Sequence, residues 1–122
     1  MSAERNEQLE LRTKKFALNI IRLYSSLPTT TVAQVLGRQL LRSGTSVGAQ
    51  CREAKRAKSI ADFVSKMEGS LQEVEETCYW LDLLVESNTS AGTEIASVMK
   101  EADELTAMFV ASVRTAKKGK SA

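Results

Sequence analysis

Basic side chains are the most numerous candidates for a functional site in this sequence. Residues 38–58 carry six basic side chains and one acidic side chain, whereas residues 59–88 carry one basic and seven acidic side chains. Lys and Arg are the residues that contact nucleic-acid phosphates. The residues that could form such a surface are Arg12, Lys14, Lys15, Arg22, Arg52, Lys55, Arg56, Lys58, Lys117 and Lys118. A solvated face, with the basic run at 52–58 opposing the negative end of a helix dipole, would explain the same residues.

Catalytic chemistry is poorly supported. The sequence has no histidine, which excludes a Ser-His or Cys-His pair, an imidazole base and a histidine metal ligand. The carboxylates of Glu75, Glu76, Asp82 and Glu86 could suggest a metal site, but the known bundle sites use a Glu-x-x-His pattern. We therefore expect a protein that is not an enzyme, with no metal, no cofactor and no small-molecule substrate.

Two features of the segment at 42–49 need a structural explanation. Gly44 and Gly48 lie in a run of small residues, where an interior glycine costs up to about 1 kcal/mol relative to alanine. Close approach of another helix would offset that cost, either within the chain or at a subunit seam. A phosphate-binding loop is disfavoured because the run follows no predicted strand and lacks the motif lysine. Arg42 lies between core turns, so we expect it to pair with Glu75 or Glu76.

Four segments with helical periodicity must position these residues. We predict helices over 6–27, 31–58, 60–88 and 91–117, followed by a basic tail at 117–122. Pro28 ends the first segment, and one of the threonines at 29–31 can cap the second. Ser59 and Asp62 form a capping-box pattern at the third, and Ser90 or Thr93 can cap the fourth.

The apolar positions of each segment recur at steps of three and four residues. Such spacing, with short loops, predicts an all-α, antiparallel up-down-up-down four-helix bundle formed by residues 1–122 as one domain. Trp80 falls beside the apolar positions of its helix, so it either covers the core edge or faces a subunit partner. The positions expected to face inward in the second and third helices are Val32, Val35, Leu36, Leu40, Val47 and Cys51, and Ile60, Val64, Met67, Leu71, Val74, Cys78, Leu81 and Val85. Those expected in the fourth are Ile95, Val98, Ala102, Leu105, Phe109 and Val113.

Composition bounds the cellular setting. The net charge is +2 over 122 residues, too small by itself to imply a nucleic-acid or membrane partner. We find no apolar run of the ~20 residues that a membrane span needs, and residues 1–8 are too polar for a signal peptide. Cys51 and Cys78 lack metal-ligand spacing, and we expect them to be buried thiols in a reducing compartment. The chain is therefore expected to be cytoplasmic.

Several short motifs occur together in this chain. They are Gln39–Ala49, Arg52-Glu53-Ala54, Ser59, Asp62-Phe63, Glu76-Thr77, Tyr79-Trp80-Leu81, Phe16-Ala17, Ile20-Ile21 and Leu27-Pro28. Jointly they resemble the four-helix bundle family of 23S ribosomal RNA intervening-sequence proteins, over about residues 9–115. The resemblance implies a ring-shaped homopentamer, and a relationship to the accessory variability subunit of diversity-generating retroelements, a basic barrel that binds a reverse transcriptase and its RNA. It also implies that Arg42, Glu53 and Glu76 belong to a polar network that fixes helix register, with Glu75 as the other candidate partner of Arg42.

The functional expectation follows from the charge pattern and the resemblance together. We expect a non-catalytic homo-oligomer, a pentamer by resemblance, that binds RNA or DNA as an accessory subunit and has a reverse transcriptase as its candidate protein partner. The alternative is a scaffold or adaptor that binds only protein, with its basic residues serving as ordinary surface charge. Phosphate contacts weaken steeply with salt and an apolar protein interface does not, so salt dependence separates the two.

Overall fold

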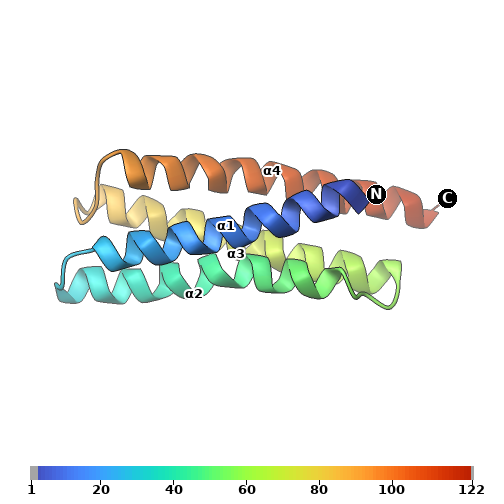
Figure 1. Cartoon of the computed structure of the whole chain (residues 1–122), viewed down its shortest axis with the longest axis horizontal. Helices are drawn as coiled ribbons and strands as arrows, with labels where there is room; N and C mark the ends of the chain where they lie inside the picture. Colours follow the sequence, from blue (N-terminus) through green and yellow to red (C-terminus); the bar gives the residue numbers. More distant parts are fainter. Residues whose placement is uncertain (1–2, 122) are drawn as a thin grey trace.

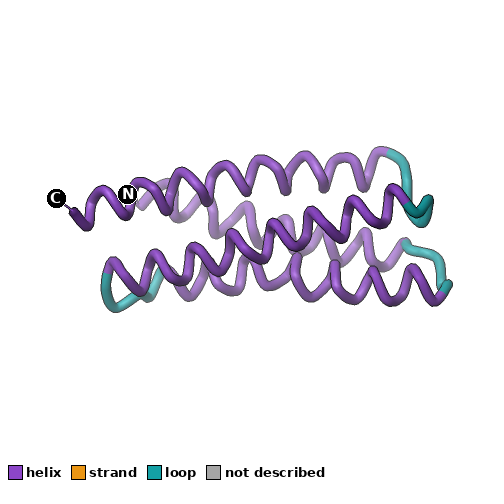
Figure 2. The backbone as a smooth tube through the Cα atoms, turned by 180° about the vertical axis from the view of Figure 1, so that it is seen from behind, coloured by secondary structure: helices purple, strands orange, loops and turns teal. Residues whose placement is uncertain are grey.

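Long helices account for nearly all of the chain. The computed structural model describes the backbone of residues 3–121 and the side chains of residues 4–119. Over this range the helices are α1 (Ala3–Ser26), α2 (Thr31–Ala54), α3 (Ile60–Glu86) and α4 (Thr93–Ser121). The loops between them are short, and the described range contains no strand (Figure 2).

Consecutive helices run antiparallel and α4 returns to lie beside α1 (Figure 1). Both chain ends and the α2–α3 loop are at one end of the bundle, and the other two loops are at the opposite end. The predicted up-down-up-down four-helix bundle is confirmed.

The core follows the predicted periodicity most closely in α4, where every position expected to face inward is buried. In α3 Val64, Met67, Val74 and Leu81 are buried as expected, Leu71 and Cys78 are half-buried, and Ile60 and Val85 at the two ends are exposed. Leu84 is buried in place of Val85, because a straight helix drifts relative to a strict seven-residue repeat.

The prediction for the first turns of α2 was wrong. Val32 and Val35 are each 53% exposed, and Ala33 and Leu40 are the buried residues. Leu40 fixes the inward face, and at 100° per residue Val35 lies about 140° away from it. The two valines therefore lie on the outer surface of the bundle.

The end of α2 also differs from the prediction, since the helix stops at Ala54 instead of continuing to residue 58. The backbone N–H groups of Lys55, Arg56 and Ala57 each bond to the carbonyl three residues earlier, at 3.2, 3.0 and 3.1 Å. These bonds form a tighter 3₁₀-type turn that ends the helix. Lys55, Arg56 and Lys58 therefore lie in the loop region.

Side-chain caps start the two central helices as expected. Thr30 Oγ1 accepts a hydrogen bond from the Ala33 N–H at 3.2 Å. Ser59 Oγ accepts one from the Asp62 N–H at 3.0 Å, and Asp62 Oδ2 accepts one from the Lys58 N–H at 3.1 Å. The Ser59–Asp62 pattern thus caps α3, with the return contact displaced by one residue.

The boundaries of α4 differ from the prediction at both ends. Asn88, at φ 58°, terminates α3 in the left-handed conformation, and Gly92, at φ 103°, precedes Thr93. The N-cap position is therefore Gly92, and neither Ser90 nor Thr93 occupies it. At the other end α4 continues to Ser121, so the basic tail is helical as far as that residue.

Candidate nucleic-acid interface

A groove runs along the outer surface between α1 and α2. Its volume is about 920 Å³ and its floor consists of small side chains, Ala17, Thr45, Gly48 and Ala49. Close packing of α1 on α2 explains the floor, because a Cβ on Gly48 would lie only 3.2 Å from Thr13 Oγ1. The small-residue run at 44–49 therefore serves packing within the chain.

Four of the ten predicted basic residues line this groove: Lys14 from α1, and Arg52, Lys55 and Arg56 from the end of α2 and the turn after it. The Arg52 and Lys55 side chains are 66% and 61% exposed. Spacings of three and four residues from Arg52 place Lys55 and Arg56 on the same side of the chain as Arg52. The groove therefore presents exposed cations over an uncharged floor.

One carboxylate lies among these cations. Glu10 Oε1 is 3.8 Å from Arg52 Nε, and Glu10 Oε2 is 3.3 Å from Lys55 Nζ. Glu53 also borders the groove, but its Oε1 is 3.1 Å from Lys66 Nζ of α3. Glu10 is thus the acidic side chain paired with the groove's basic residues.

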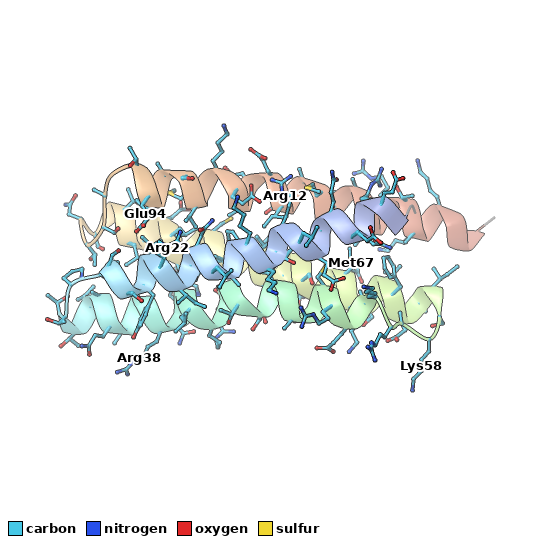
Figure 3. The ribbon with its side chains drawn as sticks, viewed as in Figure 1. Arg12, Arg22, Arg38, Lys58, Met67 and Glu94 are labelled. Atoms are coloured by element: carbon cyan, nitrogen blue, oxygen red, sulfur yellow. The ribbon has the colours of Figure 1, made fainter. Side chains whose placement is uncertain are left out.

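Arg12 lies elsewhere and is already neutralised. It donates hydrogen bonds to Glu101 at 2.6 and 2.9 Å and to Glu104 at 2.9 Å, both on α4. The hydrogen bond to Glu101 raises the pKa of the Arg12 guanidinium above its ordinary value. Figure 3 shows Arg12 between α1 and α4, on the side of α1 away from the groove. Arg12 therefore joins α1 to α4 and lies apart from the basic residues of the groove.

The other predicted basic residues are dispersed. Lys15 and Arg22 are exposed on α1 but do not line the groove, and Arg22 donates to Asn19 Oδ1 at 3.1 Å. Lys58 points away from the bundle from the α2–α3 loop (Figure 3). Lys117 is 3.2 Å from Glu68 of α3, and Lys118 lies on the same exposed end of α4. The ten residues thus do not form one continuous surface.

The expected polar network is divided into separate pairs. Arg42 contacts Glu76 directly and lies 3.5 Å from Glu73, and its side chain is 50% exposed. Trp80 Nε1 donates to Glu76 Oε2 at 2.9 Å, which anchors the indole at the core edge. Glu75 is not the partner of Arg42, and Glu53 pairs separately with Lys66. The contacts of Arg42 therefore lie on the surface of the α2–α3 seam.

The seam between α2 and α3 also contains buried hydrogen bonds that the sequence analysis does not predict. Thr77 Oγ1 and Ser43 Oγ are hydrogen-bonded at 2.9 Å, and Ser70 Oγ donates to the Val47 carbonyl at 3.0 Å. These three hydroxyl residues are fully buried. Their spacing places them on the inward faces of α2 and α3. Because a buried hydroxyl group needs a hydrogen-bond partner, this spacing alone could have predicted such contacts.

The structure gives no geometric support for a metal or a membrane span. Among the described residues, no three His, Cys, Asp or Glu side chains are close enough together to hold a metal ion. No helix in the described part is both long and apolar enough to cross a membrane. Cys51 is buried and Cys78 is half-buried, and both are free thiols.

Comparison with known proteins gives two findings. The family model described as "23S rRNA-intervening sequence protein" matches residues 7–111. A crystal structure of a protein of unknown function from the S23 ribosomal protein family of Bacteroides thetaiotaomicron superposes with a TM-score of 0.84 and 33% sequence identity, covering 90% of this chain and 98% of that one. A search of curated protein sequences gives no match. The chain belongs to the 23S rRNA-intervening sequence protein family.

Proposed function

We propose that this protein is a non-catalytic, homo-oligomeric accessory subunit of the cytoplasm that binds nucleic acid through the α1–α2 groove. The observation that carries the proposal is the convergence of Lys14, Arg52, Lys55 and Arg56 on one groove with a small, uncharged floor. Cations held along a groove can track a phosphate backbone while a floor of small residues allows its close approach.

RNA is the favoured nucleic acid. The name of the family refers to an intervening sequence of 23S rRNA. The family also resembles an accessory subunit of diversity-generating retroelements, which binds a reverse transcriptase and its RNA. The lining of the groove, among the described residues, includes no aromatic side chain. Because stacking on aromatic rings is the usual way to hold unpaired bases, we expect recognition of the backbone with weak sequence preference.

The test is binding of a fluorescently labelled single-stranded RNA measured at several salt concentrations. If four cations contact phosphates, affinity should fall by about 50-fold between about 50 and 200 mM salt. The double variant Arg52→Glu/Arg56→Glu should lower affinity at least tenfold and flatten the salt dependence. Arg38→Glu/Arg22→Glu is the control, because it changes net charge equally with residues that do not line the groove. Equal losses in both double variants, or no binding by the wild-type chain, would contradict the proposal.

The oligomer is supported by apolar side chains left on the outer helix faces. Leu11 and Leu18 of α1, Val32 and Val35 of α2, and Tyr79 of α3 are all more than half exposed. Leu11 and Leu18 are seven residues apart and therefore share one outer face of α1, and exposed apolar side chains gathered on one face are typical of subunit interfaces. Light scattering on a sizing column should give five times the chain mass of 13.4 kDa, and a monomer would contradict the pentamer.

The protein partner proposed is a reverse transcriptase that carries its RNA. The alternative function, a scaffold that binds only protein, is favoured by the same exposed apolar residues. Co-purification of the RNA and its loss at high salt would support the accessory role. A partner retained at 1 M salt without nucleic acid would favour the scaffold.

A further inference from the structure

Two outer helix faces of the bundle complement each other in charge and in apolar character. The first is on α1, where Leu11 and Leu18 are both more than half exposed. Lys15 is exposed between them, one turn from each. We call these three residues the α1 stripe. The packing of α1 on α2 and α4 leaves the stripe uncovered within the chain.

The second face is on α3. Tyr79 is more than half exposed, and the exposed carboxylates of Glu75 and Asp82 flank it one turn away on either side. We call these three residues the α3 stripe. The Tyr79 ring packs edge-on against Trp80, with ring centroids 5.1 Å apart, and Trp80 is held by its hydrogen bond to Glu76 at 2.9 Å. Tyr79 is therefore an exposed aromatic ring held in one orientation, the kind of side chain that anchors protein interfaces.

The charges of the two stripes are opposite and lack partners within the chain. Among the described residues, the ion pairs of α1 and α3 use other side chains, so Lys15, Glu75 and Asp82 remain unpaired. Two α1 stripes brought together would oppose lysine to lysine, and two α3 stripes would oppose carboxylates. Since α1 and α3 of one chain do not touch, the complement of either stripe is the other stripe on a second copy of the chain.

The two stripes lie at the same height of the bundle. Thr77 Oγ1 donates to Ser43 Oγ of α2 at 2.9 Å, and the next residue of α2, Gly44, lies against Ile20 of α1. Ile20 and Thr77 are therefore level, and α1 and α3 run in the same direction (Figure 1). A contact between stripes at one height repeats by rotation without a step along the bundle, so it builds a closed ring and not a filament.

The spacing along the two helices lets two contacts form together. Leu18 is level with Glu75, since each lies two residues before one of the level pair. One turn separates Lys15 from Leu18, and one turn separates Glu75 from Tyr79. A shift of one turn, ~5 Å, between neighbouring copies therefore puts Leu18 on Tyr79 and Lys15 beside Glu75. A tilt of each bundle against the ring axis supplies such a shift.

The charged members of both stripes lean toward α4, which sets the direction in which the ring turns. Lys15 is one turn from Arg12, whose guanidinium pairs with two carboxylates of α4. Glu75 and Asp82 are each one turn from Cys78, whose thiol lies beside α4. The two contact faces are therefore less than a half-turn apart around the bundle, on the α4 side. Successive copies turn toward α4, and the α1–α2 groove stays on the outer wall.

We propose that the α1 stripe of one copy packs on the α3 stripe of the next copy, and that repetition of this contact closes a ring with α4 on its inner wall. Leu18 packs on Tyr79, and Lys15 pairs with Glu75. This inference rests on the homo-oligomer of the proposed function and identifies the two surfaces that form it. It does not depend on RNA, because no residue of either stripe lines the groove.

The test is the mass of nucleic-acid-free protein, measured by light scattering on a sizing column at high chain concentration. Leu18→Asp and Tyr79→Asp each place a carboxylate in one stripe, so each variant should run as a single chain of 13.4 kDa. An equal mixture of the two should give a species of two chains, because one intact α1 stripe and one intact α3 stripe remain. Ile60→Asp, at an exposed apolar residue of α3 outside the stripe, is the control and should keep the wild-type mass.

Charge exchange tests the ion pair. Lys15→Glu and Glu75→Lys should each raise the concentration at which the oligomer dissociates by about tenfold, because like charges then meet. The double variant Lys15→Glu/Glu75→Lys should restore the wild-type value. Circular dichroism confirms that each variant is folded.

The outcomes separate this inference from the proposed function. A wild-type chain that runs as a monomer would overturn the homo-oligomer itself. Wild-type mass retained by Leu18→Asp or by Tyr79→Asp, or no two-chain species in their mixture, would overturn the two surfaces while the homo-oligomer stands. Failure of the charge exchange to restore assembly would overturn the pairing of Lys15 with Glu75.

Discussion

Gly44 of α2 lies against Ile20 of α1 so closely that a Cβ at residue 44 would be 2.8 Å from Ile20 Cγ1 and 2.9 Å from Ile20 Cγ2. Ile20 is fully buried and branched at Cβ, so its side chain has little freedom to move away. Gly37 faces Tyr24 in the same way, at 2.9 Å. A line of glycines thus sets the distance between the two helices.

Gly44→Ala should therefore destabilise the protein despite improving helix propensity. The propensity gain is about 1 kcal/mol, and overpacking a filled core costs about 1–3 kcal/mol, so we expect a net loss of about 1 kcal/mol in the free energy of unfolding. Urea denaturation measures it. Gly119→Ala is the control, since nothing lies within 4 Å of its Cβ position, and it should be neutral or stabilising. Ile20→Ala in the Gly44→Ala background should cost less than it does alone, and strict additivity would contradict the clash.

The Arg42–Glu76 contact should contribute little. Because the Arg42 side chain is 50% exposed, a coupling of about 0.3–1 kcal/mol is expected for such a surface pair. A double-mutant cycle of Arg42→Ala with Glu76→Ala, followed by thermal unfolding, measures it. Glu75→Ala is the matched control and should show no coupling with Arg42. A larger coupling to Glu75 than to Glu76 would contradict the pairing.

The α4 core could be predicted from the sequence because amphipathic periodicity is a local property. Each apolar position there is fixed by its distance along one helix. Helix ends were less predictable. The residue types at 55–58 would allow a helix. The chain forms a 3₁₀-type turn there instead, because it must reverse direction before α3 begins at Ile60.

The sequence identifies the basic residues that could form the candidate site, but it does not show which of them lie together. Arg12 and Lys14 illustrate this. They are two residues apart, so their side chains leave α1 about 200° from each other. Lys14 faces the α2 groove and Arg12 faces Glu101 on α4. Deciding which residue faces which helix requires the handedness of the bundle, and periodicity carries no information about that.

Glu10→Gln should strengthen binding if the groove holds RNA. The carboxylate of Glu10 pairs with Arg52 and Lys55, and phosphates would have to compete with it. Removing the charge should raise affinity about 3- to 10-fold at low salt, the range for one or two exposed pairs. Glu7→Gln is the control, because it removes the same charge one turn earlier on α1 and does not line the groove. Equal effects in the two variants would contradict local competition.

The reactivity of Cys51 should report its burial. Removal from water raises the pKa of the Cys51 thiol to about 11, because burial disfavours the thiolate. Only the thiolate reacts with iodoacetamide, so the modification rate should rise about tenfold per pH unit from pH 7 and still be rising at pH 10, whereas an ordinary thiol levels off above about pH 9. Mass spectrometry of the Cys78→Ser variant isolates Cys51, with a short unstructured Cys peptide as the control. A plateau near pH 9 would mean that the Cys51 thiol is solvated, and would contradict its burial in the core.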